Sequence, residues 1–273
     1  MKKLRHLTEN QEREVFNERL NGATGKDIVG KWGISTRHIK NIVLKFGGKI
    51  RKKKKWCSFN QEYFEKIDTE DKAYFLGFIV ADGCINDRVN EITITQKETE
   101  ILYKFKSYIN SDGNIHTHKN RNISSFTITS KKTKKDLENL GIPPRKSRVI
   151  KYPKIQENLQ NHFMRGVFDG DGCITLRTDR RDGNQRGQFN ICSGSKDFIG
   201  EFYERLVKYC NLSGKNKIRN PIGTYYVVDW GSLSDIEKIH DFLYRDATVF
   251  LERKKETFDK VVSITKTKTK YRK

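Results

Sequence analysis

The sequence predicts an α+β protein built from two similar halves and preceded by a small helical domain. One observation is a short apolar stretch ending in Asp-Gly-Cys-Ile, which occurs twice and so indicates an internal repeat. A second is that segments of alternating apolar and polar residues follow each copy, a pattern typical of half-buried antiparallel strands. The third is that residues 1–48 carry helix-capping signals and apolar residues at helical spacing.

Residues 8–46 predict three helices. Thr8 with Gln11 three residues on is a capping box for the first helix, Thr24 can cap the second, and Ser35 can cap the third. A glycine makes the turn between the last two helices, which is the layout of a helix-turn-helix. We expect the third helix to enter the major groove of DNA, and the side chains available there are Thr36, Arg37, His38 and Lys40. A helical bundle without a role in DNA binding is the alternative.

The net charge of +21 is concentrated in particular segments. Residues 49–58 contain six basic residues and no acidic one, and residues 264–273 contain five basic residues and no acidic one. Such a surplus indicates attraction to a polyanion, of which nucleic acid is the foremost candidate. Self-repulsion should keep the first segment extended as a linker, and its Lys52, Lys53 and Lys54 should contact phosphates. The second segment lacks apolar periodicity, so we expect a tail that is disordered until DNA binds.

The first half, residues 59–153, opens with an apolar helix that ends at Asp82-Gly83. Glycine commonly ends helices in the left-handed conformation, and we expect that conformation here. The elements expected after this helix are strands over 84–86 and 91–95, a helix ending near 109, strands near 113–118 and 122–130, and a short helix ending at Leu140. Two prolines shortly after Leu140 forbid any continuation of the last helix.

The second half, residues 154–263, repeats this order after a helix that ends at Asp171. The expected elements are strands over 173–178 and 188–193, a helix around 198–210, strands over 214–219 and 223–230, and helices over 234–245 and about 250–262. Four strands in each half would pack one face on the helices and present a polar, basic face to solvent. A two-stranded ribbon fits the major groove of DNA. The side chains of the first hairpin that we expect to contact DNA are Arg177, Arg180, Arg181 and Arg186.

Each repeated helix has two small residues four positions apart: Gly77 and Ala81 in the first copy, Gly166 and Gly170 in the second. Residues at this spacing share a helix face, so the two flat stripes can pack backbone to backbone. That packing would bring Asp82 and Asp171 side by side at the ends of their helices, where the helix dipole disfavours negative charge. Two carboxylates about 5 Å apart also repel by roughly 3 kcal/mol at an effective dielectric of 20. A divalent cation would remove both penalties, whereas a single Asp-Gly could equally be a simple helix stop.

Residues 75–83 read Phe-Leu-Gly-Phe-Ile-Val-Ala-Asp-Gly, and residues 164–172 read Met-Arg-Gly-Val-Phe-Asp-Gly-Asp-Gly. Both resemble the nine-letter motif of the LAGLIDADG homing endonucleases in their single-chain form with two repeats, and the resemblance covers roughly residues 60–262. It implies that the motif helices form the interface between two pseudo-symmetric αββαββα halves, whose antiparallel sheets make a saddle. The first copy departs from the motif at its sixth position, where Val80 replaces the acid that Asp169 retains.

The resemblance also implies a chemistry. In this family the penultimate acids, here Asp82 and Asp171, bind the metals that cleave DNA, together with the carbonyls that precede them, here those of Ala81 and Gly170. Oxygen ligands favour Mg²⁺, or another divalent cation such as Mn²⁺, or Ca²⁺ in a non-cleaving complex. Divalent ions that bridge the attacked and leaving oxygens activate water, neutralise the phosphate and assist the leaving oxygen.

Further catalytic roles follow from the same resemblance. Gln96 matches a family position that orients water or metal, and the second half has Ser193 there, which would lose or alter that role. A lysine near the end of each half polarises the water network in relatives. Lys146 and Lys254 are our candidates for it, with Arg253 as a rival. An ordinary solvated surface residue is the alternative for each of these basic side chains.

The five cysteines include no Cys-x-x-Cys pair, so the sequence indicates neither a disulfide framework nor a zinc site of that type. We expect Cys84 and Cys173 to be small buried residues that open strands, with a soft metal ligand as the alternative. The six histidines show no metal-ligand spacing. There is no apolar run of membrane-spanning length and no signal peptide, so we expect a cytoplasmic protein that does not contact membranes.

We therefore expect a monomeric, site-specific endonuclease with internal pseudo-two-fold symmetry, which cuts one phosphodiester in each strand of a long double-stranded DNA target. Cleavage would promote the mobility of an intron or of its own gene. One alternative is a catalytically inactive transcription regulator of the same fold, and another is an RNA maturase that binds intron RNA. The end of the sequence lacks the His-Asn pair of an intein, so we expect no intein-embedded form.

Overall fold

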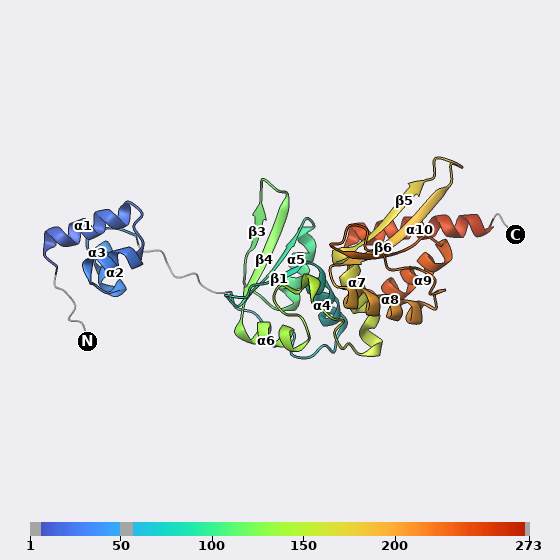
Figure 1. Ribbon diagram of the computed structural model, residues 1–273, viewed down its shortest axis with the longest axis horizontal. Helices are drawn as coiled ribbons and strands as arrows, with labels where there is room; N and C mark the ends of the chain where they lie inside the picture. Colours follow the sequence, from blue (N-terminus) through green and yellow to red (C-terminus); the bar gives the residue numbers. More distant parts are fainter. Residues whose placement is uncertain (1–6, 50–56, 271–273) are drawn as a thin grey trace. The chain divides into compact units, whose positions relative to one another are not determined.

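The computed structural model describes residues 7–49 and 57–270 (Figure 1). The chain forms two compact units, Met1–Lys55 and Trp56–Lys273, which divide within the basic segment 49–58. The phosphate contacts predicted for Lys52, Lys53 and Lys54 lie outside the described residues. Among the residues that are described, no helix is both long enough and apolar enough to cross a membrane.

The N-terminal unit consists of three short helices, α1 (Glu9–Leu20), α2 (Gly25–Trp32) and α3 (Thr36–Lys45). Each begins at its predicted cap. The hydroxyls of Thr8, Thr24 and Ser35 accept hydrogen bonds from backbone N–H groups three residues on. A separate small core holds the helices together, and its buried members are Val15, Ile28, Ile34, Ile39, Ile42 and Val43. The helix-turn-helix layout is therefore confirmed as a local structure.

The first half of the larger unit follows the predicted order. Its elements are α4 (Glu70–Asp82), β1 (Gly83–Ile85), β2 (Glu91–Gln96), α5 (Thr99–Tyr108), β3 (Ile115–His118), β4 (Ile123–Thr129) and α6 (Lys131–Asn139). The strands form one antiparallel sheet in the order β1-β2-β4-β3. Alternate residues Ile92, Ile94, Phe126 and Ile128 are buried. The residues between them therefore present a polar face on the other side of the sheet, as the alternation predicts.

The second half has one strand fewer than we predicted. Its elements are α7 (Gln160–Asp171), β5 (Gly172–Thr178), β6 (Gln185–Ser193), α8 (Lys196–Cys210), β7 (Tyr226–Trp230), α9 (Leu233–Tyr244) and α10 (Glu252–Lys270), and the sheet order is β5-β6-β7. The strand predicted over 214–219 is wrong, because only Arg219 forms a bridge, with Val227. Gly214 has a φ of 65°, which strand geometry does not allow. Asn216 Nδ2 instead donates to Asp229 O at 2.6 Å, so a side chain takes the place of a ladder hydrogen bond.

Helix α10 is longer than predicted, since it continues to Lys270 instead of ending near 262. The expectation of a disordered tail is therefore wrong for residues 265–270, and residues 271–273 lie outside the described part of the chain. Phe258, Val261 and Val262 are buried and anchor the first turns on the domain. Once a helix is nucleated, each further residue adds one hydrogen bond, and Lys is a good helix former.

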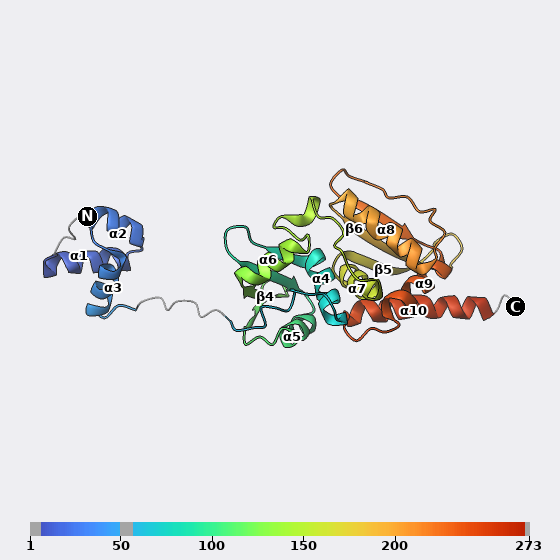
Figure 2. The same ribbon diagram turned by 90° about the horizontal axis from the view of Figure 1, so that it is seen from below.

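Helices α4 and α7 lie side by side at the centre of the larger unit (Figures 1 and 2). Their contact is backbone against backbone. A Cβ on Gly77 would overlap Phe163 O and lie 3.0 Å from Val167 N, and one on Gly166 would overlap Tyr74 O. The predicted pairing of the two small-residue stripes is thus present.

The glycines that follow the two helices serve a different purpose from the one expected. Gly83 and Gly172 have φ values of −74° and −88°, so neither is left-handed. A Cβ on Gly83 would lie 2.6 Å from Ile79 O, and one on Gly172 would lie 2.7 Å from Phe168 O. Glycine is required here because the strand leaves directly against the last helical turn, where there is no room for a side chain.

The hairpins β3–β4 and β5–β6 extend to the same side of the larger unit (Figure 1). The sheets to which they belong flank the central helices, which gives the predicted saddle of antiparallel sheets. Because β1 and β5 begin where α4 and α7 end, the two Asp-Gly pairs lie where the helices join the sheets.

Candidate active site

Asp82 and Asp171 are the last residues of α4 and α7 and occupy equivalent positions in the two halves. Both are half-buried. A Cβ on Gly170 would lie 3.0 Å from Asp82 Oδ2, so the Asp82 carboxylate lies against the residue that precedes Asp171. The close packing of the two helices therefore brings the two carboxyl groups into one site.

A buried lysine closes each half of this site. Lys146, on a single 3-10 turn, donates from Nζ to Gly83 O at 2.7 Å and to Ala81 O at 3.4 Å. Lys254, in the first turn of α10, donates to Gly172 O at 2.6 Å and to Gly170 O at 3.4 Å, and also to Phe168 O at 2.7 Å. Their exposed fractions are 7% and 6%, which excludes the solvated-surface alternative for both. An ammonium group at this position satisfies the last helix carbonyls and offsets the negative end of the helix dipole.

The two acids and the two lysines are electrostatically linked. Burial raises the pKa of Asp82, while Lys254, the hydrogen bond from Gln96 and Lys146 oppose that rise. Burial and the charge of Asp82 raise the pKa of Asp171 to about 6, while Lys146 and Lys254 oppose it. Burial also lowers the pKa of both lysines, against the attraction of nearby aspartates. The repulsion between the acids is thus offset within the protein, by lysines whose proximity the sequence spacing could not reveal.

The lysine of each half acts more strongly on the aspartate of the other half. Among the charges that lower the pKa of Asp82, Lys254 comes before Lys146, and for Asp171 the order is reversed. The four groups therefore form one crossed cluster and not two separate pairs.

Gln96 and Ser193 hold equivalent places with different contacts. Gln96 Nε2 donates to Asp82 Oδ2. The strand register makes Ser193 its counterpart, since Ile94 pairs with Gly83 and Ile191 pairs with Gly172. The Ser193 hydroxyl accepts from Ser195 N at 3.2 Å, in the turn before α8, and no hydrogen bond from Ser193 to Asp171 occurs within the described residues.

Arg253 does not belong to this site. Its Nε donates to Glu98 Oε1 at 2.9 Å, and its side chain is 65% exposed. The ion pair joins α10 of the second half to the start of α5 in the first half, so it is an exposed contact between halves.

The cysteines that follow the two Asp-Gly pairs are exposed, so the prediction that they are buried is wrong. In β1 and β5 the flanking glycine and isoleucine are buried, which turns Cys84 and Cys173 to the open face of the sheet. The alternation of strand residues carried that signal. Cys192 lies close by, and its Sγ is 3.3 Å from Asp171 O.

The oxygen atoms of this site suit a hard divalent cation. Two carboxylates lie next to two carbonyls, those of Ala81 and Gly170, and hard cations prefer such oxygen ligands. No group of three or more His, Cys, Asp or Glu side chains arranged to hold a metal occurs within the described residues. Any bound cation would therefore complete its coordination with water or phosphate oxygens, as Mg²⁺ commonly does.

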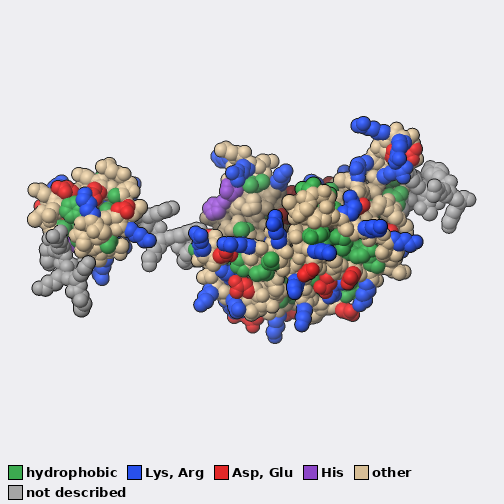
Figure 3. Space-filling view, viewed as in Figure 1, with side chains coloured by type: hydrophobic (Ala, Val, Ile, Leu, Met, Phe, Trp, Pro, Cys, Tyr) green, Lys and Arg blue, Asp and Glu red, His purple; other side chains and the backbone are tan. Residues whose placement is uncertain are grey.

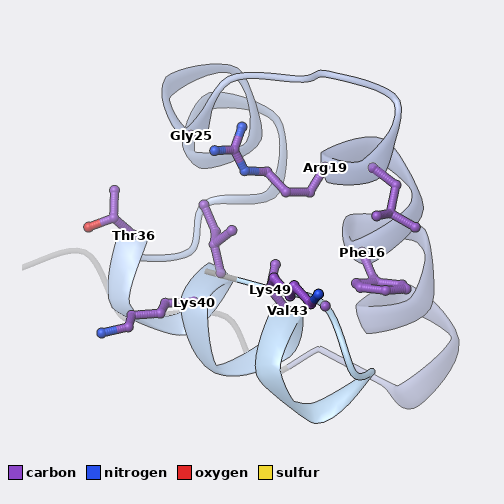
Figure 4. Close-up of a pocket in the computed structure, with 10 residues that line it drawn as sticks. Phe16, Arg19, Gly25, Thr36, Lys40, Val43 and Lys49 are labelled. Carbon is purple, nitrogen blue, oxygen red and sulfur yellow. The ribbon is translucent and has the colours of Figure 1, made fainter. Parts of the chain in front are cut away.

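The helix-turn-helix side chains divide into exposed and engaged groups. Thr36, Arg37 and Lys40 are exposed on α3. His38 lies 3.7 Å from Glu12 Oε1 on α1, so its ring faces the bundle and not the open side of α3. Next to Thr36 and Lys40 is a pocket of about 540 Å³, which Phe16 and other residues of α1 line from the opposite side (Figure 4).

The arginines of the β5–β6 hairpin are partly neutralised. Basic side chains, all of them arginines, gather at its tip (Figure 3). Arg181 pairs with Asp179 at 2.9 Å, and Arg186 pairs with Asp179 at 2.9 Å and with Asp182 at 2.6 Å. These hydrogen bonds, first that from Arg181, lower the pKa of Asp179 to about 2. Arg177 and Arg180 are exposed, so the hairpin combines exposed cations with internally paired ones.

Structural comparison places the fold among known proteins. A LAGLIDADG meganuclease bound to uncleaved DNA, I-AabMI, matches 72% of this chain and 91% of its own, with a TM-score of 0.52 and 17% identity. The LAGLIDADG homing endonuclease I-GzeII in complex with its DNA target matches 75% of this chain and 92% of its own, with a TM-score of 0.54 and 14% identity. The chain has the fold of the LAGLIDADG homing endonucleases, which confirms the resemblance inferred from the two motifs.

Sequence comparison finds parts of larger proteins. A probable translation initiation factor IF-2 of Methanocaldococcus jannaschii is 30% identical over 201 residues, which is 68% of this chain and 15% of that protein. A replication factor C small subunit from the same organism is 25% identical over 138 residues, which is 48% of this chain and 7% of that protein. The chain thus spans a small fraction of the length of these curated relatives. No family model matches the sequence.

Proposed function

We propose that this chain is a site-specific endonuclease that cuts both strands of double-stranded DNA. The observation that carries the proposal is a cluster at the junction of α4 and α7, where the aspartates that end the two helices lie beside two buried lysines that donate to the helix-end carbonyls. Burying charged groups costs free energy unless they are paired. A protein that only bound DNA would need no such cluster at the centre of its saddle, because phosphate contacts from surface residues suffice for binding.

The residues of the chain have separable roles in this proposal. Asp82 and Asp171, with the carbonyls of Ala81 and Gly170, would hold divalent cations. When bound, Mg²⁺ supplies a Lewis acid for the phosphate and lowers the pKa of bound water. Lys146 and Lys254 would fix the helix-end carbonyls and place positive charge beside the scissile phosphates.

Gln96 would orient Asp82 in the first half alone, because Ser193, its counterpart, makes no hydrogen bond to Asp171 within the described residues. The two catalytic halves are therefore similar in their acids and lysines and different in the support of those acids. One acid in each half corresponds to one cut in each strand.

The open faces of the two sheets offer different chemistry to DNA. In the first half the face carries rows of hydroxyls, with Thr93 and Thr127 Oγ1 atoms 2.9 Å apart and Thr95 Oγ1 and Ser125 Oγ 2.9 Å apart. Hydroxyls both donate and accept, so they can read several base edges. In the second half Arg177 pairs across the strands with Arg186, which suits guanine edges and phosphates. Such inequivalent faces favour a target whose two half-sites differ.

The helix-turn-helix unit would add a second DNA contact through Thr36, Arg37 and Lys40. Linking two binding modules raises the effective concentration of the second module at the DNA. A long target read by two modules fits an enzyme that cuts rarely and so promotes the mobility of the element that encodes it.

Sequencing the products formed from a randomised double-stranded DNA library in Mg²⁺ tests the proposal. We expect one enriched site with a cut in each strand. Asp82→Asn and Asp171→Asn should each abolish double-strand cleavage and leave DNA binding within a few-fold of wild type. Asp197→Asn, at an exposed acid of α8, is the matched control and should cut normally.

Two results would exclude the proposal. Wild-type binding to one DNA site without cleavage in any divalent cation would indicate a transcription regulator of the same fold. Selective binding to structured intron RNA with no DNA preference would indicate a maturase.

A further inference from the structure

A network of buried hydrogen bonds holds the segment that leads to Lys254. Thr248–Leu251 is the last part of the connection from α9 to α10, and the backbone N–H groups of Lys254 and Lys255 donate to Leu251 O, both at 3.1 Å. The position of Leu251 therefore sets where α10 begins. It also sets where the ammonium of Lys254 meets the end of α7.

Asp169 accepts the hydrogen bond that anchors this point. The side chain is 1% exposed, and its Oδ2 accepts from Leu251 N at 2.8 Å. The same carboxylate accepts from the hydroxyl of Tyr74, on α4, at 2.8 Å and from the hydroxyl of Tyr244, on α9, at 3.4 Å. Three donors from three elements thus converge on one buried carboxylate.

Two more charged side chains hold the earlier part of the segment. Glu70 accepts from Thr248 N and from its hydroxyl, both at 2.7 Å. Arg165, one turn before Asp169 on α7, donates to Val249 O at 2.9 Å and to Glu70 Oε1 at 2.6 Å. Charge-assisted hydrogen bonds of this kind are stronger than neutral ones and constrain geometry tightly.

In the first half, the equivalent lysine is held in position by different contacts. The position equivalent to Asp169 is Val80, which offers no acceptor. Pro143 and Pro144, whose rings fix φ, lead instead to Lys146, and Arg145 pairs with Asp87 at 2.6 Å. Lys146 is thus placed by a stiff local backbone, whereas Lys254 depends on a buried carboxylate.

We infer that Asp169 is a positioning residue that holds Lys254 at the active site, and that Lys146 does not depend on it. The inference rests on the proposed function only where it concerns cleavage. If Lys254 serves mainly one of the two cuts, loss of Asp169 slows that cut more than the other and nicked DNA accumulates. Because Lys146 does not need a carboxylate at the sixth motif position, the first motif copy can have Val80 there.

Acetylation of the full-length protein without metal or DNA tests the positioning directly. Acetic anhydride labels the neutral amine, so the rate depends on both the accessibility and the pKa of each lysine, and the Asp169→Asn variant below, which also lacks the charge, separates the two effects. Mass spectrometry reads Lys254 and Lys146 in the same sample. In Asp169→Val the labelling of Lys254 should rise roughly tenfold, as loss of hydrogen bonds to a charged group allows. Labelling of Lys146 should stay at its wild-type level.

Two variants calibrate this measurement. Asp169→Asn keeps an oxygen that can accept from Leu251 N, so its Lys254 should label nearly as slowly as in wild type. Val80→Ala truncates the equivalent buried position of the first half and should leave Lys254 labelling unchanged. Equal increases at Lys254 and Lys146 in Asp169→Val would overturn the inference.

If Asp169→Val fails to fold, hydrogen exchange of the wild-type protein still tests the inference. The Leu251 amide must then be among the slowly exchanging amides, and rapid exchange there would overturn its hydrogen bond to Asp169 as an anchor.

Strand-specific labelling of a cleaved target tests whether loss of Asp169 slows one cut more than the other. Equal slowing of both strands by Asp169→Val would overturn that consequence. Selective labelling of Lys254 with no cleavage by wild type would retain the positioning role and refute the proposed function.

Discussion

Substitution of Gly166 by alanine tests the contact on which the whole architecture depends. A Cβ at this position would overlap Tyr74 O and lie 2.9 Å from Phe78 N. Both are backbone atoms of α4, so no flexible side chain can move aside. Helices α4 and α7 would have to separate by on the order of 1 Å to restore ordinary contact distances.

The expected cost follows from this geometry. Overpacking a core typically costs about 1–3 kcal/mol and more where backbone must shift, so we expect Gly166→Ala to lower the free energy of unfolding by about 3 kcal/mol or more. In a domain of this size, 1 kcal/mol changes the melting temperature by about 2–4 °C, so the melting temperature should fall by about 6–12 °C. Gly200→Ala is the matched control in α8, where a Cβ meets nothing within 4 Å. That change should raise stability by up to about 1 kcal/mol, because alanine is the better helix former.

Differential scanning calorimetry of the full chain measures both variants under the same conditions. The reasoning fails if Gly166→Ala melts at or above the wild-type temperature, or if the two substitutions have the same effect. DNA cleavage provides a second readout, because separation of the helices moves Asp82 away from Asp171. A folded Gly166→Ala protein that cut DNA at the wild-type rate would contradict the requirement for close helix packing.

The charged hairpin, the acids and the lysine caps give three further tests. Asp179→Asn should release Arg181, whereas Arg186 keeps its pair with Asp182. DNA affinity should therefore rise, and the slope of log K against log salt should steepen by up to about one unit, which anisotropy titrations measure; an unchanged slope would contradict it. Because the pKa of Asp171 is raised to about 6, its carboxyl is protonated below that pH, so Mg²⁺ affinity should fall as pH drops through 6. Calorimetry at several pH values checks this, and a constant affinity from pH 7 to pH 5 would exclude Asp171 as a ligand. Lys146→Met removes a charge that lowers the pKa of Asp171, so the midpoint of the same pH profile should move upward.

Local signals predicted the parts of the structure that depend on neighbours in sequence. The caps at Thr8, Thr24 and Ser35 form because a hydroxyl three residues before an N–H needs no tertiary contact to reach it. The helix stripes at Gly77 and Gly166 were also predictable, because small residues four apart share a helix face and the same spacing occurs in both copies of the repeat. The two antiparallel sheets and the saddle followed from the repeat and the family resemblance together.

The remaining features depend on contacts that are distant in sequence. Lys146 and Lys254 were identifiable as candidates only through the resemblance, and their bonds to helix-end carbonyls become visible only when the halves are folded. The strand predicted over 214–219 contains only one strand-favouring residue, Ile218, and the glycine at its start has a positive φ that prevents strand pairing there. Alternation should have turned Cys84 outward, and the preference of cysteine for burial misled the prediction.

The charge balance of the site predicts that DNA and divalent cations bind more tightly together than either does alone. In the free protein Lys146 and Lys254 offset Asp82 and Asp171, so an added cation gains little. Phosphates of bound DNA bring further negative charge to the same place, and only then does a divalent cation relieve net repulsion. Coupling between two ligands is reciprocal, so Ca²⁺ should tighten DNA binding and DNA should tighten Ca²⁺ binding by the same factor.

We expect that factor to be at least about tenfold, equivalent to about 1.4 kcal/mol. Titrations with Ca²⁺ measure it without cleavage, first for DNA at fixed Ca²⁺ and then for Ca²⁺ at saturating DNA. Asp82→Asn with Asp171→Asn in one protein should abolish the coupling, because no carboxylate remains to share the cation with a phosphate. Tenfold coupling that survives in this double variant would mean that the cation binds elsewhere on the saddle, and it would separate the aspartates from the bound DNA.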